Sequence, residues 1–232
     1  MGNLDKKIKM IIRGVIVILI FWYSTYLQLI PVKIFNLDIE HLSRSMKVIL
    51  STFSSIIVLF ILFFIYRKEL VKDFKKFKDN LVENIDVGVR YWMIGLIIMM
   101  ISNIIINYLF KAGGANNEQA VQSMIKTLPW LMLIDAGFIA PINEEIVFRK
   151  TLKDIFTNKW IFVILSFLLF GGVHVLGSAK DALDYLYIIP YGALGGAFAL
   201  AYYETDTVFT SISMHMFHNI VLTLLSIVTM FL

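Results

Sequence analysis

Long, continuous apolar stretches dominate this chain and restrict what it can fold into. Of its 232 residues, 59% are hydrophobic and only 16% are charged, and the mean hydropathy is +0.78. Soluble domains are about half apolar and a quarter charged, so this composition is typical of an integral membrane protein. The runs do not alternate apolar and polar residues, which favours helices over a transmembrane barrel. We therefore expect an all-α, polytopic membrane bundle of about seven transmembrane helices.

Clusters of Asn, Gly, Pro or charged residues separate the apolar stretches, as at Lys111–Asn117 and Gly177–Asp184. The predicted spans are Ile11–Ile30, Val48–Tyr66, Tyr91–Phe110, a long helix from Leu128 to Phe156, Trp160–Leu176, Tyr185–Tyr203 and Phe209–Leu232. No small-x-small cleavage site follows the basic start, so we interpret the first stretch as a retained span. The segment Arg67–Asn80 mixes basic, acidic and apolar residues, which predicts an amphipathic helix at the membrane surface.

The distribution of Lys and Arg predicts the orientation. If the N-terminus is cytoplasmic, 15 of the 21 Lys and Arg residues lie on the cytoplasmic side and 6 outside, as the positive-inside rule favours. We therefore expect a multi-pass protein of the cell membrane with a cytoplasmic N-terminus and an external C-terminus. The net charge of +4 then indicates contact with anionic lipid headgroups rather than nucleic acid. The Ile-, Lys- and Asn-rich, cysteine-free composition favours a bacterial plasma membrane.

Polar side chains gather in the last four spans, where each costs at least a few kcal/mol unless it is paired or functional. They include Glu144, Glu145, Arg149, His174, His215 and Asn219. If the connection near Asn158 is the tip of a helical hairpin, the first glutamate and the first histidine lie about 21 and 24 Å from it. The second histidine and the asparagine lie about 14 and 20 Å in from the same side. We expect these groups to converge in one layer that is reached from the cytoplasm.

Helical spacing assigns faces to these residues. Glu145 and Arg149 are four residues apart, so they share a face and are predicted to form an ion pair. Glu144 lies about 100° around the helix and is left to face the bundle interior. His215 and Asn219 also share a face. Gly171 and Gly172 are expected to allow close helix packing.

These residues form three motifs, and through them the chain resembles a known family. Glu-Glu-x-x-x-Arg occupies 144–149, Phe-x-x-x-His occupies 170–174 and His-x-x-x-Asn occupies 215–219. The chain resembles the CAAX-protease and bacteriocin-processing (CPBP or Abi) family of intramembrane endopeptidases, apart from Lys150, where many members have Gly. The likeness implies a catalytic core of four helices over 128–232. Residues 1–127 would then add three N-terminal spans and a cytoplasmic basic loop at 67–90.

The resemblance also implies roles for the site residues. Glu144 would activate a water molecule as general base, and His174 would help to bind or polarise that water. His215 and Asn219 would stabilise the developing oxyanion. Glu145 and Arg149 would form a structural ion pair. The implied reaction is hydrolysis of a peptide bond in a membrane-associated, hydrophobic or lipidated peptide.

The residues leave the cofactor open between zinc and a metal-free, glutamate-dependent mechanism. Glu144, His174 and His215 make a set of three zinc ligands with one open position, as catalytic zinc requires. No His-Glu-x-x-His signature supports a metal, and the two histidines are predicted at different depths in their helices. These two observations slightly favour the metal-free mechanism.

Other functions are compatible with the same fold. One is a non-catalytic membrane regulator or bacteriocin-immunity protein, which would have a membrane-protein partner. The intact catalytic set argues against it, because a non-catalytic protein has no need of all four groups. Another is a proton-coupled transporter, against which stands the lack of repeated halves. His218, Asp135, Asn103 and Asn107 are interpreted as structural, mainly in helix–helix hydrogen bonds.

Overall fold

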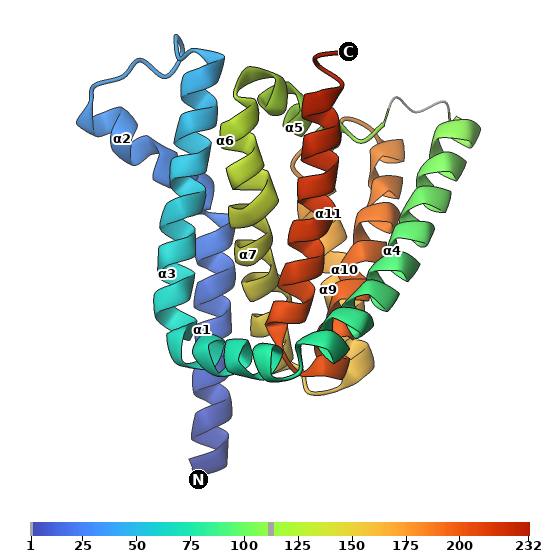
Figure 1. Cartoon of the computed structure of the whole chain (residues 1–232). Helices are drawn as coiled ribbons and strands as arrows, with labels where there is room; N and C mark the ends of the chain where they lie inside the picture. The colour runs from blue at the N-terminus through green and yellow to red at the C-terminus, as the bar shows by residue number, and fades with distance from the viewer. Residues whose placement is uncertain (1, 111–113) are drawn as a thin grey trace.

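The computed structural model describes residues 2–110 and 114–232, and this part of the chain contains helices and no strand. The helices form an upright bundle with the N-terminus at one end and the C-terminus at the other (Figure 1). The long helices are α1 (Gly2–Trp22), α3 (Arg44–Asp79), α4 (Leu81–Phe110), α9 (Lys159–Val175), α10 (Ile188–Thr205) and α11 (Val208–Val228). The prediction of an all-α membrane bundle is confirmed.

The number of spans agrees only approximately with the prediction. Within the described residues, four helical stretches are long and apolar enough to cross a membrane, and a bent pair raises the number to five. That pair, Leu4–Trp22 and Ser24–Ile34, bends by 53°, so the first predicted span is not one straight helix. Its second arm, a 3-10 turn (Ser24–Gln28) followed by α2 (Leu29–Ile34), leaves the side of the bundle (Figure 1). Helix α9 is apolar but has only 17 residues.

The long helix predicted from Leu128 to Phe156 is interrupted by two π-helical segments. It runs as α6 (Pro129–Ile134), η2 (Asp135–Ile139), α7 (Ala140–Glu145), η3 (Ile146–Thr151) and α8 (Leu152–Ile155), where η2 and η3 are π-helical. Such wide turns are rare and often lie at functional sites. In the second one, the Thr151 hydroxyl donates to the carbonyl oxygen of Ile146 at 2.9 Å. The two glutamates end the short α-helix between the wide turns.

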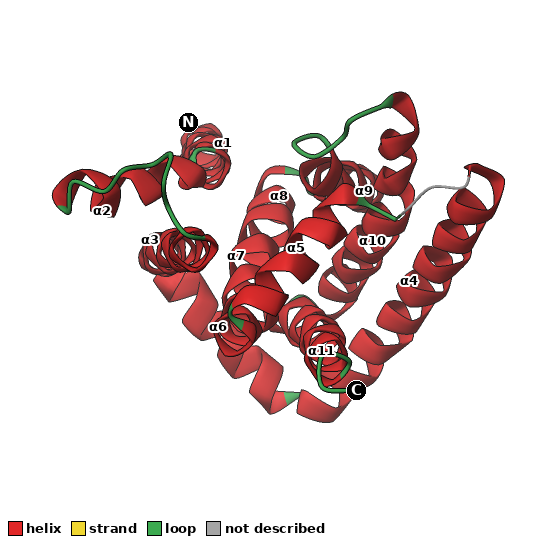
Figure 2. Cartoon of the chain, turned by 90° about the horizontal axis from the view of Figure 1, so that it is seen from above, coloured by secondary structure: helices red, strands yellow, loops and turns green. Residues whose placement is uncertain are grey.

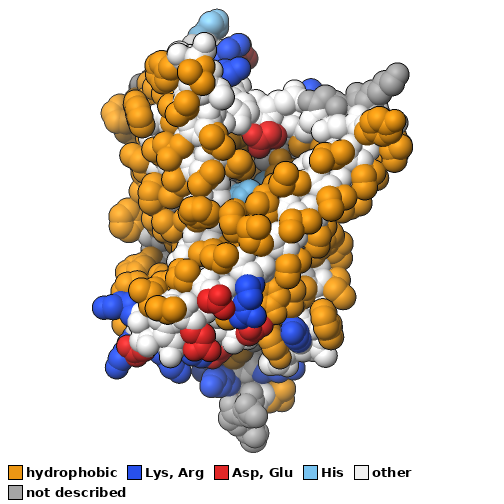
Figure 3. Space-filling model, turned by 45° about the vertical axis from the view of Figure 1, so that its right-hand side comes forward, with side chains coloured by type: hydrophobic (Ala, Val, Ile, Leu, Met, Phe, Trp, Pro, Cys, Tyr) orange, Lys and Arg blue, Asp and Glu red, His pale blue; other side chains and the backbone are white. Residues whose placement is uncertain are grey.

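The predicted amphipathic segment Arg67–Asn80 continues α3 as far as Asp79 and turns across the base of the bundle (Figure 1). Lys, Arg, Asp and Glu side chains gather at this base, while hydrophobic side chains cover most of the surface above it (Figure 3). This distribution is expected if the charged base lies at the membrane–water interface and the apolar surface above it lies in the hydrocarbon layer.

Buried charge at the base corrects one expectation. The charged stretch Arg149–Lys159 predicts an end that projects into the cytoplasm. Arg149 is instead fully buried and Lys150 is 7% exposed. The Lys150 ammonium pairs with Asp154 at 2.7 Å, and the same carboxylate group pairs with Arg13 of α1 at 2.7 Å. Arg13 also pairs with Glu69 at 2.6 Å, so this network joins α1, α3 and α8.

Helices α9 and α10 pack closely through glycine. A Cβ atom on Gly171 would lie 2.5 Å from the carbonyl oxygen of Ile188, and one on Gly195 would lie 3.0 Å from that of Ser166. The expectation of close packing therefore holds for Gly171. At Gly172 a Cβ atom would meet only a Leu176 methyl group at 3.5 Å, so this glycine is not needed for the packing.

Helix α5 (Asn116–Thr127) crosses the top of the bundle, at the end opposite the charged base (Figures 1 and 2). The connection that precedes it, predicted over Lys111–Asn117, is described only from Gly114, and Lys111 lies outside the described residues. The largest core cluster joins Val17 and Leu62 to Val147, Phe162 and other residues of the last helices. It thus spans both predicted segments, 1–127 and 128–232, whose division stays a prediction.

Replacing Gly171 with Ala should lower the free energy of unfolding by about 1–3 kcal/mol, because the new methyl group meets backbone rather than a movable side chain. Gly172→Ala is the matched control and should change stability by less than about 1 kcal/mol. Thermal unfolding of the two purified proteins in detergent measures the difference. Equal melting temperatures for both variants would contradict the packing argument.

Candidate active site

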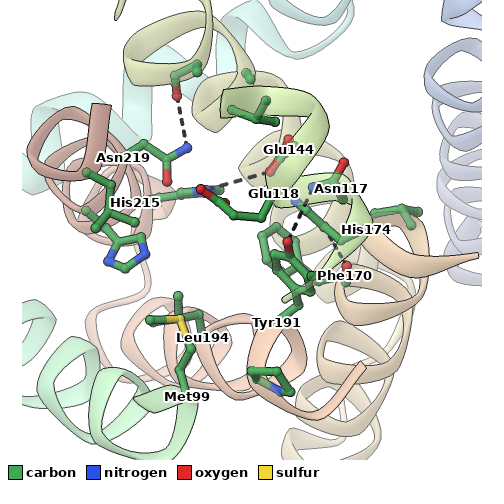
Figure 4. A pocket seen from close by; sticks show the side chains of 18 of the residues that line it. Met99, Asn117, Glu118, Glu144, Phe170, His174, Tyr191, Leu194, His215 and Asn219 are labelled. Atoms are coloured by element: carbon green, nitrogen blue, oxygen red, sulfur yellow. Dashed lines mark hydrogen bonds and ion pairs between the residues drawn. The ribbon is translucent and has the colours of Figure 1, made fainter. Parts of the chain in front are cut away.

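The predicted site residues line one cavity of about 600 Å³ inside the bundle. Glu144, His174, His215 and Asn219 all contribute to its wall. Figure 3 shows a hollow on this side of the molecule with a histidine side chain at its floor, and Figure 4 shows the four side chains around the cavity. Much of the rest of the wall comes from α4, α5 and α10 and includes Met99, Asn103, Asn117, Glu118, Tyr191, Leu194 and Phe198.

The two adjacent glutamates occupy different environments. The Glu144 side chain keeps 16% of its surface exposed, and its Oε2 lies 3.7 Å from His215 Nε2. The Glu145 side chain is fully buried, and its Oε1 accepts a hydrogen bond from His215 Nδ1 at 2.8 Å. His215 therefore lies between the two carboxylates. The contact between Glu145 and this histidine was not predicted from the sequence.

The fully buried Arg149 lies beneath the site. Its Nε is 3.2 Å from Glu145 Oε2, a contact that is close enough for an ion pair but lacks hydrogen-bond geometry. Its Nη2 donates to the carbonyl oxygen of Gly195 at 3.2 Å. The guanidinium carbon lies 4.4 Å from the centre of the Phe170 ring, a cation–π contact. Phe170, the first residue of the Phe-x-x-x-His motif, thus covers the buried cation.

Local contacts hold His174 at the cavity wall. Its Nδ1 donates to the Phe170 carbonyl oxygen at 2.8 Å, because that oxygen can only accept. Its ring stacks on Tyr191, with centroids 4.7 Å apart and planes 24° apart. In the neutral imidazole, Nε2 then carries the lone pair. The Phe170 ring lies 4.5 Å from the His174 ring and 5.5 Å from the His215 ring, so the predicted difference in depth does not keep the two histidines apart.

Asn219 supports the first wide turn. Its Nδ2 donates to the carbonyl oxygen of Ala136 at 2.9 Å. The π-helical partner of that carbonyl would be the N–H of residue 141, which is a proline and has none. The side-chain amide thus supplies the missing donor. One of its two N–H groups is used in this way, and the second remains for a ligand.

The other polar residues of the spans make the kinds of contact predicted for them, apart from Asn103, which lines the cavity. Asp135 accepts from the Thr52 hydroxyl at 3.0 Å, and Asn107 accepts from the Tyr187 hydroxyl at 2.8 Å. His218 accepts from Trp92 Nε1 at 3.3 Å. It also lines the cavity.

Zinc needs nitrogen and oxygen donors that converge on one point. Among the described residues, no three His, Cys, Asp or Glu side chains converge as ligands of one ion. Glu145 and the Nδ1 atoms of both histidines are engaged in the contacts above. Glu144, His174 and His215 have suitable donor atoms but do not meet at one point.

Sequence reasoning missed the contribution of α5 to the cavity. Asn117 Nδ2 lies 3.5 Å from the Tyr191 hydroxyl, and Glu118 lines the cavity one residue further on. The apolar spacing of Val121 and Ile125, four residues apart, was a signal that one face of this helix packs against the bundle.

The chain is similar in sequence to known proteins over the region that carries the motifs. The family model described as "Type II CAAX prenyl endopeptidase Rce1-like" matches residues 126–221, a range that contains all three motifs. The chain is 30% identical over 146 residues to the Bacillus subtilis protein named "Putative membrane peptidase YdiL", covering 61% of this chain and 56% of that protein. It is 32% identical over 128 residues to the UPF0177 protein YbdI of Lactococcus lactis, covering 51% of this chain and 67% of that protein.

A further relative is an uncharacterized protein of Mycoplasma capricolum, which is 28% identical over 167 residues. The match covers 68% of this chain and 48% of that protein, so the chain spans about half the length of this relative and of the Bacillus protein. No solved structure matches the chain significantly. Its three motifs, its membrane bundle and these matches lead to one conclusion: the chain belongs to the Rce1-like, CAAX-protease and bacteriocin-processing family of membrane proteases.

Proposed function

We propose that this protein is an intramembrane endopeptidase that hydrolyses a peptide bond in a membrane-associated, hydrophobic or lipidated peptide, with Glu144 as the general base. The observation that carries the proposal is the separation of the two glutamates. Glu145 is buried against a cation, whereas Glu144 lines the cavity with its Oε2 3.7 Å from His215 Nε2. A partly exposed carboxylate beside imidazoles in a largely apolar cavity is suited to removing a proton from water.

The proposed reaction uses the residues of the cavity wall. Glu144 takes a proton from a water molecule that also donates to His174 Nε2, and the water oxygen attacks the scissile carbonyl carbon. The tetrahedral intermediate collapses as the C–N bond breaks, and the leaving nitrogen receives the proton from Glu144. This proton transfer returns Glu144 to its carboxylate form, and the products then leave the cavity.

Oxyanion stabilisation is assigned to His215 and Asn219. The Nδ1 of His215 donates to Glu145, so its Nε2 donates to an oxyanion only in the imidazolium form. Because Arg149 is also positive, the two carboxylates, Glu144 and Glu145, together balance the two cations. The second N–H of Asn219 supplies the other donor. Glu145 therefore acts as a positioning residue in addition to its ion pair with Arg149.

The orientation of the protein determines the side from which a substrate enters. The cavity extends toward α5, where Asn117, Glu118 and Gln122 line it, and α5 lies opposite the charged base (Figure 1). With the orientation favoured by the positive charges, this end faces the outside. We therefore propose a cytoplasmic N-terminus, an external C-terminus and a site reached from the outer half of the bilayer, in place of the cytoplasmic access expected from helix lengths.

Glu144→Gln should abolish processing, by at least about 100-fold, while the protein stays folded, because the base is lost and the volume is kept. Glu145→Gln should chiefly lower abundance and melting temperature, since it leaves Arg149 buried without its carboxylate, at a cost of about 3–5 kcal/mol. Comparative peptide profiling of cells that express each variant, with thermal unfolding of the purified proteins, measures both effects. The opposite pattern would refute the assigned roles.

The orientation can be measured by thiol labelling, because the chain has no native cysteine. Ser123→Cys on α5 should react with a membrane-impermeant maleimide in intact cells. Asp79→Cys at the charged base should react only after permeabilisation. Labelling in the reverse order would show that the cavity opens toward the cytoplasm.

We propose the metal-free mechanism, in keeping with the lack of a converged ligand set. The purified, active protein should contain well under one equivalent of zinc and keep its activity in a strong chelator. Elemental analysis and chelator titration test this. Stoichiometric zinc, with activity lost on stripping and restored on adding the metal back, would establish the zinc mechanism instead.

A further inference from the structure

The cavity wall carries an imbalance of charge. Its lining includes two carboxylates, Glu118 and Glu144, and no Lys or Arg from the described part of the chain. The Arg149 guanidinium is fully buried and faces Glu145. Glu144 has His215 beside it. The Glu118 carboxylate accepts a hydrogen bond from a neutral group, the side-chain amide of Gln122, at 2.8 Å.

Hydrogen bonds connect Glu118 and its neighbours to helices that carry the other residues of the cavity wall. Gln122, which donates to its Oε1, also lies 2.9 Å from the Ser226 hydroxyl of α11. The preceding residue, Asn117, contacts the Tyr191 hydroxyl, and the Tyr191 ring stacks on His174. Figure 4 shows Glu118 among the side chains that line the cavity.

We propose that Glu118 is a specificity-determining residue that binds a Lys or Arg side chain of the substrate close to the scissile bond. The inference rests on the proposed endopeptidase function and narrows its substrate class. Glu118 is exposed and lines the cavity, and no Lys or Arg of the described residues lines it. A cationic side chain of the substrate can therefore pair with its carboxylate, and such charge complementarity gives specificity. A second carboxylate, Glu144, adds to this attraction and disfavours acidic peptides.

The rest of the cavity wall determines which substrate residues can lie next to the bound Lys or Arg. Met99, Leu194, Phe198 and Leu222 give the cavity an apolar lining. The favoured substrate is therefore an apolar peptide segment with a single basic residue within reach of α5. Glu118 contacts the substrate but does not take part in bond cleavage.

The test uses the full-length protein in liposomes and short fluorogenic peptides of Ala, Leu, Val and Phe. The peptides are identical except for Lys, norleucine or Glu scanned through each position. The wild-type protein should prefer Lys over norleucine by roughly three- to tenfold in kcat/KM at one or two positions, as one partly exposed ion pair allows. Glu118→Gln should remove the preference but still cleave the norleucine peptides, and Glu118→Lys should shift it toward Glu.

Glu83→Gln, an exposed carboxylate change at the base of α4, is the matched control and should keep the wild-type preference. Equilibrium binding of the same peptides to the inactive Glu144→Gln protein separates binding from cleavage. Preference for Lys in binding, without cleavage by the wild type, would support the cation subsite and refute the endopeptidase. Equal cleavage of the three peptides by the wild type, no binding of any peptide, or a preference that survives Glu118→Gln would overturn the proposal for Glu118.

Discussion

The fully buried contact between Arg149 and Glu145 is the interaction on which the rest of the site depends. Bringing two charges out of water costs several kcal/mol for each ion, so each needs compensation from its surroundings. The guanidinium obtains it from Glu145, the Gly195 carbonyl oxygen and the Phe170 ring. The carboxylate also accepts from His215. These contacts tie α7 and η3 to α9, α10 and α11, and they fix the histidine that faces the cavity.

The two wide turns explain how neighbouring glutamates serve different purposes. Proline at 141 removes one backbone donor, and Asn219 replaces it at the Ala136 carbonyl oxygen. In the second turn, the Thr151 hydroxyl donates a hydrogen bond to the Ile146 carbonyl oxygen. Between these irregularities the short helix α7 presents Glu145 to the core and leaves Glu144 at the cavity. Asn219 thereby also supports the turn that precedes the helix carrying Glu144.

The cavity is completed by parts of the chain that carry none of the motifs. Helix α5 crosses its upper end, α4 contributes Met99 and Asn103, and α1 contributes Phe21. The N-terminal region is therefore more than a set of generic spans. Helix α5, which belongs to this N-terminal region, places the Glu118 carboxylate in the cavity wall. In our proposal the N-terminal region therefore selects the substrate, and the C-terminal helices supply the residues that cleave the peptide bond.

The sequence by itself determined the membrane bundle, the amphipathic helix after residue 66 and the set of polar residues at the site, because apolar length and helical spacing are local properties. It also indicated that Glu145 faces Arg149, since residues four apart share a helix face. Only the tertiary structure decided the contact of Glu145 with His215, the stacking of Tyr191 on His174 and the place of α5 over the cavity. These contacts join residues far apart in the chain, and the two π-helical turns between Leu128 and Phe156 change the register that regular helical spacing assumes.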